Sequence, residues 1–155
     1  MIKIIGDGGH AKVVRHVLAC QPYRDWCNEE DAFVAIGNNA QRHSEVSRLA
    51  GHSFPVLIHP SAIVAQDVEI GCGTVIMANA VVQPAVKIGR HCILNTNCSV
   101  DHDCIIHDFA HIAPGAVLCG GVTVGEGALV GAGVVCVPGA VIPPWSLVKA
   151  GSVAK

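Results

Sequence analysis

The chain has little charge and few aromatic residues. Charged side chains make up 14% of its 155 residues, the formal net charge is −2, and the aromatics are three Phe, two Trp and one Tyr. So little charge of either sign argues against a broad surface for nucleic acid or for an anionic membrane. So few aromatics, beside seventeen glycines, indicate a repeat protein with a narrow interior and many tight turns.

Long apolar runs are also absent, although 51% of the residues are hydrophobic and the mean hydropathy is +0.48. The run over residues 128–140 is broken by glycine and proline and is too short to span a bilayer. Residues 1–6 predict a short strand and lack the apolar region and cleavage site of a signal peptide. We therefore expect a cytoplasmic protein of one domain, or of one domain and a small appendage.

The eight cysteines form no Cys-x-x-Cys pair. Cys92, Cys98 and Cys104 instead fall six residues apart, at a repeat position that small side chains occupy. A free cysteine behaves as a small buried hydrophobe. We therefore expect reduced, structural thiols instead of disulfides or metal ligands.

Residues 1–56 predict a small α/β unit. A strand at 3–5 leads through the turn Gly-Asp-Gly-Gly-His-Ala into a helix that ends near residue 19, an arrangement that directs backbone N–H groups at a phosphate. A dinucleotide site would also need a second strand ending in an acid about 20 residues further on. Residues 21–30 are polar and turn-like instead, so NAD is not expected. A strand at 32–36, a turn at 37–39 and a helix at 40–50 complete a truncated, Rossmann-like βαβα unit.

Residues 57–155 are predicted to form the second domain, and residues 57–152 of it consist of sixteen uninterrupted hexads. The second position is aliphatic in all but one of them, where it is Cys136, and the last position is small or β-branched. This period predicts a triangular prism in which three hexads make one coil, with about five coils and a length of roughly 25 Å. Corners that require a positive φ should carry glycine or asparagine. The partly apolar sides and open end coils favour association of three chains.

Residues 100–111 carry three histidines and three acids within an otherwise nearly uncharged region. The hexad register turns His102 and Asp103 outward at a corner, and it turns Val100, Cys104 and Ile106 into the core. A histidine titrates near neutral pH and suits a general base, which a neighbouring carboxylate can orient. Cys104 should be inaccessible, so no acyl-enzyme is expected.

Other histidines receive simpler interpretations. His107, His59 and His91 are expected at the surface. His102 and His107 have the spacing of a zinc pair in prism proteins of the γ-carbonic anhydrase type, but the position two coils earlier, where a third ligand would stand, is Gln66. We therefore expect no metal site.

Three ordered motifs carry a resemblance to a known family. They are Gly-Asp-Gly-Gly-His-Ala-Lys-Val-Val at 6–14, Ile-Gly-Asn-Asn at 36–39, and Leu-Asn-Thr at 94–96 followed by His-Asp-Cys at 102–104 and Phe-Ala-His at 109–111. The chain resembles the hexapeptide-repeat, left-handed β-helix acyltransferases. More narrowly, it resembles the sialic-acid O-acetyltransferases and the UDP-4-amino-sugar N-acetyltransferases of bacillosamine synthesis.

The resemblance implies roles for particular residues. His102 would be the general base and Asp103 its acidic partner. The nucleotide-sugar site would be lined by Gly8, Gly9, His10 and Gly37. Acetyl-CoA, the co-substrate, would lie in a groove between subunits of a homotrimer, held by His111, Asn95, Ala132 and Ala150.

The chain departs from the family pattern in two places. Aspartate stands at 103 where the family commonly has glutamate, so the orienting contact could pass to Asp101. The second strand of the N-terminal unit is missing, which leaves the sugar and nucleotide open. The resemblance implies an N-acetyltransferase acting on a UDP-type 4-amino sugar in surface-glycan assembly. Acetylation of a sialic-acid-type hydroxyl and a non-catalytic sugar-binding prism are the alternatives.

Overall fold

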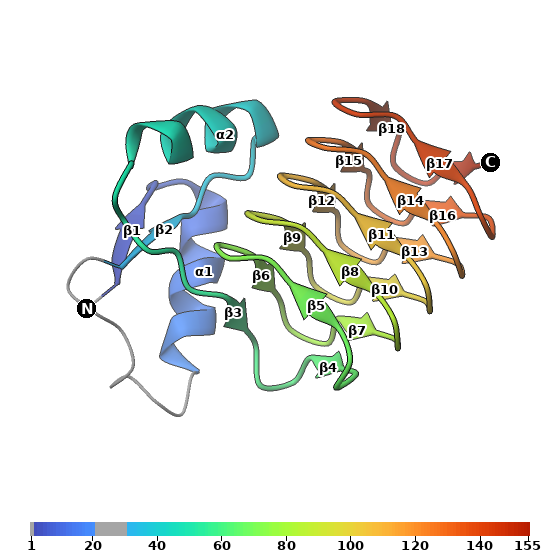
Figure 1. The fold of residues 1–155 in the computed structure, drawn as a ribbon, viewed down its shortest axis with the longest axis horizontal. Coiled ribbons are helices and arrows are strands. Elements are labelled where there is room, and N and C mark those ends of the chain that lie inside the picture. Colours follow the sequence, from blue (N-terminus) through green and yellow to red (C-terminus); the bar gives the residue numbers. More distant parts are fainter. Residues whose placement is uncertain (1, 21–30) are drawn as a thin grey trace.

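The computed structural model describes residues 2–20 and 31–155. The polar segment predicted at 21–30 lies outside these residues. Figure 1 shows a small α/β unit beside the first coils of a β-solenoid, with the C-terminus at the opposite end. No helix in the described part of the chain has the length and hydrophobicity needed to cross a membrane.

The N-terminal unit pairs two parallel strands, β1 (Lys3–Ile5) and β2 (Ala32–Val34), and adds two helices, α1 (Gly9–Ala19) and α2 (Asn39–Arg48). The sequence predicted all four elements. α1 begins at Gly9, inside the segment expected to be a turn, and β2 ends two residues before the expected limit. α2 begins one residue earlier and ends two residues earlier than expected. Asn38 is the N-cap of α2, and its side chain accepts a hydrogen bond from the Gln41 N–H at 3.0 Å.

From Leu57 onward the chain winds into a parallel solenoid with three sheets of two-residue strands. The first sheet contains β3 (Leu57–Ile58), β6 (Val75–Ile76), β9 (Ile93–Leu94), β12 (His111–Ile112), β15 (Leu129–Val130) and β18 (Leu147–Val148). The second contains β4 (Ile63–Val64), β7 (Val81–Val82), β10 (Ser99–Val100), β13 (Val117–Leu118), β16 (Val135–Cys136) and β19 (Val153–Ala154). The third contains β5 (Glu69–Ile70), β8 (Lys87–Ile88), β11 (Ile105–Ile106), β14 (Thr123–Val124) and β17 (Val141–Ile142).

Successive coils are in register. Ser99 pairs with Val81 in the preceding coil and with Val117 in the following one, so each coil takes three hexads. Aliphatic second-position residues such as Val100 and Ile106 fill the axis together with the small residues Cys98 and Cys104. Cys92, Cys98 and Cys104 are fully buried, which confirms the structural role predicted for them.

Fourteen corners, spaced six residues apart from Gly73 to Gly151, have a positive φ. Glycine or asparagine fills nine of them, as expected. The expectation is wrong at the other five, which are Ala85, His91, Asp103, Phe109 and Trp145. Hydrogen bonds to the preceding coil fix these corners whatever the residue: the Trp145 N–H donates to Glu126 O at 2.7 Å, and the Phe109 N–H to Arg90 O at 2.8 Å. Tertiary hydrogen bonding thus offsets a backbone strain of order 1–3 kcal/mol at each corner.

His91 was predicted at the surface, and this is wrong: only 5% of it is exposed. Its ring stacks on Phe109 with centroids 5.2 Å apart and meets Phe54 edge-on. Burial, followed by the charge of Arg42, lowers its pKa to about 4. The N-terminal unit buries this corner, and the hexad period carries no information about such a contact. His107 is exposed, as predicted.

The N-terminal unit packs on the outward side chains of the first sheet. One buried cluster joins the two parts of the chain. From the N-terminal unit it contains Ala11, Val14 and Val17 of α1 with Phe33 and Ala35, and from the prism it contains Leu57, Val75, Met77 and Ile93. The three α1 residues recur at the spacing of a single helix face. This shared core fixes α1 and its preceding turn against the prism.

Candidate functional site

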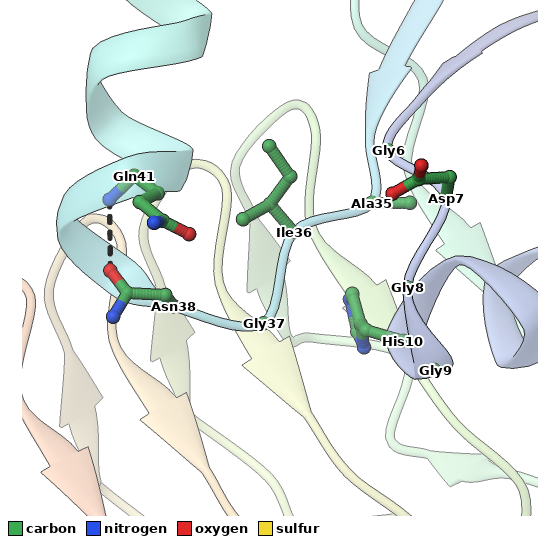
Figure 2. A pocket seen from close by; sticks show the side chains of 10 residues that line it. All are labelled: Gly6, Asp7, Gly8, Gly9, His10, Ala35, Ile36, Gly37, Asn38 and Gln41. Atoms are coloured by element: carbon green, nitrogen blue, oxygen red, sulfur yellow. Dashed lines mark hydrogen bonds between the residues drawn. The ribbon is translucent and has the colours of Figure 1, made fainter.

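A pocket of about 410 Å³ lies between the β1–α1 turn and the β2–α2 turn (Figure 2). It is lined by Gly6, Asp7, Gly8, Gly9, His10, Ala35, Ile36, Gly37, Asn38 and Gln41. The four residues predicted to line a nucleotide-sugar site, Gly8, Gly9, His10 and Gly37, all belong to this lining. The parallel pairing of β1 with β2 places both turns at the same edge of the small sheet.

The start of α1 suits an anion. The helix begins at Gly9, its N-cap is Gly8, no side chain caps it, and its first turn contains no acid. The first N–H groups of a helix lack intrahelical partners, and the helix dipole favours negative charge there. The start of α2 lines the same pocket through Asn38 and Gln41 (Figure 2). Both helix starts therefore face the space in which a phosphate could sit.

His10 forms the floor of this pocket next to Gly37. A Cβ placed on Gly37 would lie 3.6 Å from His10 Cβ. Burial, reinforced by the charge of Arg42, lowers the pKa of His10 to about 4. Its Nε2 is buried and has no hydrogen-bond partner in the structure.

His111 and Asn95, both predicted to hold acetyl-CoA, are brought together. Asn95 Nδ2 lies 3.1 Å from His111 Nε2. His111 stands on β12, in the first sheet, and its pKa is lowered to about 4 by burial and then by the charges of Arg42 and His10. This pair therefore lies beneath the N-terminal unit, next to the pocket floor.

Ala132 and Ala150, the other two residues predicted near acetyl-CoA, are exposed. Each follows a strand of the first sheet, so both share the prism edge on which Asn95 lies. Ala132 O already accepts the Gly151 N–H at 2.8 Å. The four predicted cofactor residues are thus divided between one open edge and the adjoining first sheet.

His102 and Asp103 occupy the corner after β10, where the chain passes from the second sheet to the third. His102 Nδ1 lies 2.7 Å from Asp103 Oδ2, and the two side chains are 62% and 67% exposed. Asp103 therefore makes the orienting contact itself, although it is one methylene shorter than glutamate. Asp101 instead accepts the His102 backbone N–H at 2.9 Å.

The surroundings of His102 favour its charged form and fix its ring. The hydrogen bond that His102 donates to Asp103, followed by the charge of Asp101, raises the pKa of His102. The ring packs over Gly120 in the next coil, where a Cβ would stand 2.7 Å from His102 Cε1 and 2.9 Å from Nε2. A side chain at position 120 would displace the imidazole. Nδ1 is held by Asp103, which leaves Nε2 free to accept a proton.

Sequence reasoning missed Arg42, which is 1% exposed. Its guanidinium donates to His91 O at 2.9 Å, Phe109 O at 2.7 Å and Ile36 O at 2.9 Å. Asn39 Oδ1 accepts a further bond at 2.8 Å. Burial lowers the pKa of Arg42 to about 10, so it stays charged at neutral pH. One buried cation thus joins the β2–α2 turn to two prism corners. An arginine in a polar helix carries no sequence signal for this role.

The predicted groups occupy two separate parts of a single chain. The pocket, His111 and Asn95 lie on or beside the first sheet, whereas His102 and Asp103 lie at the corner between the second and third sheets. The second sheet separates that corner from the edge that carries Asn95. His107 stands at yet another corner, after β11.

Comparison with known proteins gives a consistent result. The family model for bacterial transferase hexapeptide (six repeats) matches residues 67–102 and 103–138. UDP-N-acetylbacillosamine N-acetyltransferase from Bacillus subtilis is 39% identical, over 50% of the chain and 51% of that protein. GDP-perosamine N-acetyltransferase from Escherichia coli O157:H7 is 36% identical, over 54% of the chain and 38% of that protein. The chain spans about half the length, or less, of these curated relatives.

Solved structures match almost the whole chain. The acetyltransferase domain of PglB from Neisseria gonorrhoeae, in complex with acetyl coenzyme A, is 32% identical with a TM-score of 0.88, covering 97% of this chain and 88% of that one. PerB from Caulobacter crescentus, in complex with CoA and GDP-perosamine, is 34% identical with a TM-score of 0.92, covering 99% and 88%. The expected left-handed parallel β-helix, preceded by a small α/β unit, is confirmed. The chain belongs to the bacterial hexapeptide-repeat transferases.

Proposed function

We propose that this chain transfers the acetyl group of acetyl-CoA to the amino group of a nucleotide-linked amino sugar, with His102 as general base. The observation that carries the proposal is the His102–Asp103 pair, at 2.7 Å on an exposed corner, in a chain whose fold matches sugar N-acetyltransferases over nearly its full length. Two perosamine N-acetyltransferase structures from Caulobacter crescentus are histidine variants, one to asparagine and one to alanine.

The reaction is a direct transfer. The amine nitrogen attacks the thioester carbonyl carbon, and His102 Nε2 takes the proton that the nitrogen loses. The C–S bond then breaks, and His102 returns the proton to the sulfur of the departing CoA. A general base of this kind is typically worth about 10²–10⁴ in rate. Asp103 holds the ring in the tautomer that leaves Nε2 unprotonated. Asn95, or a backbone N–H, would donate to the oxygen of the tetrahedral intermediate.

The pocket at residues 6–10 and 35–41 is proposed to hold the nucleotide sugar. The start of α1, which no side chain caps, supports a diphosphate-linked ligand. The family resemblance implies a UDP-type sugar in surface-glycan assembly. The relatives named above act on either UDP- or GDP-linked sugars. The assay therefore includes both nucleotides, to show which nucleobase the substrate carries.

The catalytic corner and the pocket are proposed to meet across a subunit interface in a homotrimer. Within one chain they lie at different edges of the prism, so a neighbouring chain must bring His102 to the pocket. Exposed apolar residues on the outer faces, Ile63 at 67%, Val141 at 65% and Leu147 at 64%, support such association.

Acetyl transfer to a panel of UDP-, GDP- and TDP-linked amino sugars, followed by release of free CoA thiol, tests the function. The His102→Ala variant should lose about 10²–10⁴ of kcat while keeping its fold and oligomeric state. His107→Ala removes another exposed corner histidine and should keep full activity. Near-normal turnover by His102→Ala would contradict the proposed base. Transfer to sialic-acid hydroxyls alone would favour the O-acetyltransferase alternative, and absence of any acetyl-CoA binding would favour a non-catalytic prism.

A further inference from the structure

Two histidines and a cysteine meet where the end of α1 approaches the first coil of the prism. His16 lies in the last turn of α1, Cys20 caps that helix, and His59 directly follows β3. One ligand atom from each side chain lies within 4.8 Å of the others. Within residues 2–20 and 31–155 this is the one such group of three possible ligands. The sequence predicted no metal site and placed His59 at the surface.

The geometry of the cluster suits a tetrahedral metal. His16 and Cys20 are four residues apart, so they share one helix face, and His16 Nε2 lies 3.7 Å from Cys20 Sγ. Zinc takes nitrogen ligands at about 2.0–2.1 Å and sulfur at about 2.3 Å, which sets tetrahedral neighbours roughly 3.3–3.8 Å apart. The His59 ring already stands over His16 with centroids 5.7 Å apart. Small side-chain rotations would bring the third ligand into place.

Ser61 provides an outer contact for His59. Its Oγ lies 2.8 Å from His59 Nδ1 and is held in turn by the Asn79 N–H at 3.1 Å. A histidine that binds metal through Nε2 usually donates its other N–H to such an oxygen. The Ser61 backbone N–H also points at Nδ1, at 3.1 Å, which favours the tautomer with a bare Nδ1 in the metal-free chain. Zinc binding through Nε2 would move the ring proton to Nδ1, which would then donate to Ser61 Oγ and give up the bond that it accepts from the Ser61 N–H.

We propose that His16, Cys20 and His59 bind a zinc ion that clamps the end of α1 to the first coil of the prism. Thiolate and imidazole ligands together favour zinc over the hard cations magnesium and calcium. The fourth position is open to water, because His16 is exposed and Cys20 and His59 are partly exposed. An α1 of eleven residues is about 16 Å long. The cluster is therefore at the opposite end of α1 from the pocket, and its role is structural.

Zinc binding to the full chain, first freed of metal with a chelator, tests the proposal. We expect one zinc ion per chain and protection of Cys20 from alkylation by at least about tenfold, read peptide by peptide by mass spectrometry. Cys72 is exposed and outside the cluster, so its alkylation should not change. Cobalt(II) in place of zinc should give the visible spectrum of a tetrahedral thiolate site.

Variants distinguish the clamp from a site on the helix alone. Tight zinc binding should be abolished in each of His59→Gln, His16→Gln and Cys20→Ser. Zinc binding should be weakened by roughly 10–100-fold in Ser61→Ala. The control His107→Gln should bind zinc as the parent chain does. Zinc at 100 times its Kd should raise the folded-to-unfolded ratio about 100-fold and so raise Tm in the parent but not in His59→Gln. Unchanged zinc affinity in His59→Gln, or unprotected Cys20 in the parent, would overturn the proposal.

Discussion

At the scale of single residues, the corner after β10 carries the proposed catalytic pair. Asp103 stands at φ 61°, a conformation that aspartate adopts more readily than most residues. This turns its carboxylate back onto His102 Nδ1 at 2.7 Å. Shortening glutamate to aspartate therefore does not transfer the orienting role to Asp101, whose carboxylate accepts a backbone N–H instead. The left-handed corner makes the shorter acid sufficient.

The raised pKa of His102 gives a prediction for the pH dependence of activity. A base works only when neutral, so kcat/KM should rise as pH rises through the pKa of His102 in the free enzyme. Asp103 is the first cause of the raised pKa. Asp103→Asn should therefore move the acidic limb of the profile to lower pH. It should also lower the plateau, by less than the roughly 10⁴-fold loss at a buried triad aspartate, because this pair is exposed. Asp108→Asn is the control, and an unmoved limb in Asp103→Asn would contradict the assignment.

At the scale of elements, α2 fastens the N-terminal unit to the prism through polar contacts. Its buried residues are Asn39 and Arg42. Both donate hydrogen bonds to backbone carbonyls at prism corners: Arg42 to His91 O and Phe109 O, and Asn39 to Gly127 O at 3.0 Å. His43 adds edge-on contacts with Phe109 and Trp145. The pocket between α1 and α2 therefore depends on a polar junction whose partners are almost all backbone.

Replacing Arg42 should damage both stability and the pocket. Arg42→Met keeps the aliphatic stem but leaves several buried carbonyls without donors, each costing about 1–3 kcal/mol. We expect a lower Tm and a KM for the nucleotide sugar that rises more than kcat falls, because the β2–α2 turn loses its anchor. Arg48→Met, which removes an exposed arginine of the same helix, is the matched control. A wild-type KM in folded Arg42→Met would refute the anchoring role.

The same junction should be sensitive to acid. The pKa values of His10, His91 and His111 are all lowered to about 4. In the unfolded chain a histidine titrates near 6.5, so below that pH the unfolded state binds more protons. The contribution of these neutral histidines to the free energy of unfolding is therefore fully present above pH 6.5, and it is lost as pH falls from about 6.5 to about 4. Thermal denaturation should show Tm falling across this window. His91→Phe should flatten the fall, and His107→Gln should not.

At the scale of the whole molecule, the proposed active site requires two chains. A mixing experiment tests this with two variants: His102→Ala removes the proposed base, and Gly8→Asp should disable the pocket. A Cβ at Gly8 meets nothing within 4 Å, and the residue is the N-cap of α1, where aspartate stabilises the helix but would repel a phosphate. Each variant alone should be inactive as a homotrimer. Gly8→Asn, the neutral isostere, should retain nucleotide-sugar binding.

Mixing the two inactive variants should restore activity. In a three-fold ring every mixed trimer has one interface that joins an intact pocket to an intact His102. Random assembly at equal amounts should therefore recover about a quarter of the parent activity. The measurement is acetyl transfer after co-refolding of two differently tagged chains. A site contained within one chain would give no recovery, and that result would contradict the proposed arrangement.

The sequence by itself determined the solenoid and which of its side chains face outward. A six-residue period specifies which side chains enter the core, so Val100, Cys104 and Ile106 and the outward His102 could be placed without a structure. The glycine turn likewise placed Gly8, Gly9 and His10, because a strand, turn and helix fix local geometry. These predictions succeeded because each depends on neighbouring residues or on a strict repeat.

Only the tertiary structure decided what the N-terminal unit covers. Its docking buries His91, lowers the pKa of His111 and gives Arg42 its carbonyl partners, all through residues distant in sequence. The meeting of His16 and Cys20 with His59 has the same origin, because α1 and the first coil approach one another only after folding. The separation of His102 from the pocket is likewise a property of the closed prism. The six-residue period predicts which side chains face outward, whereas only tertiary packing decides which residues contact them.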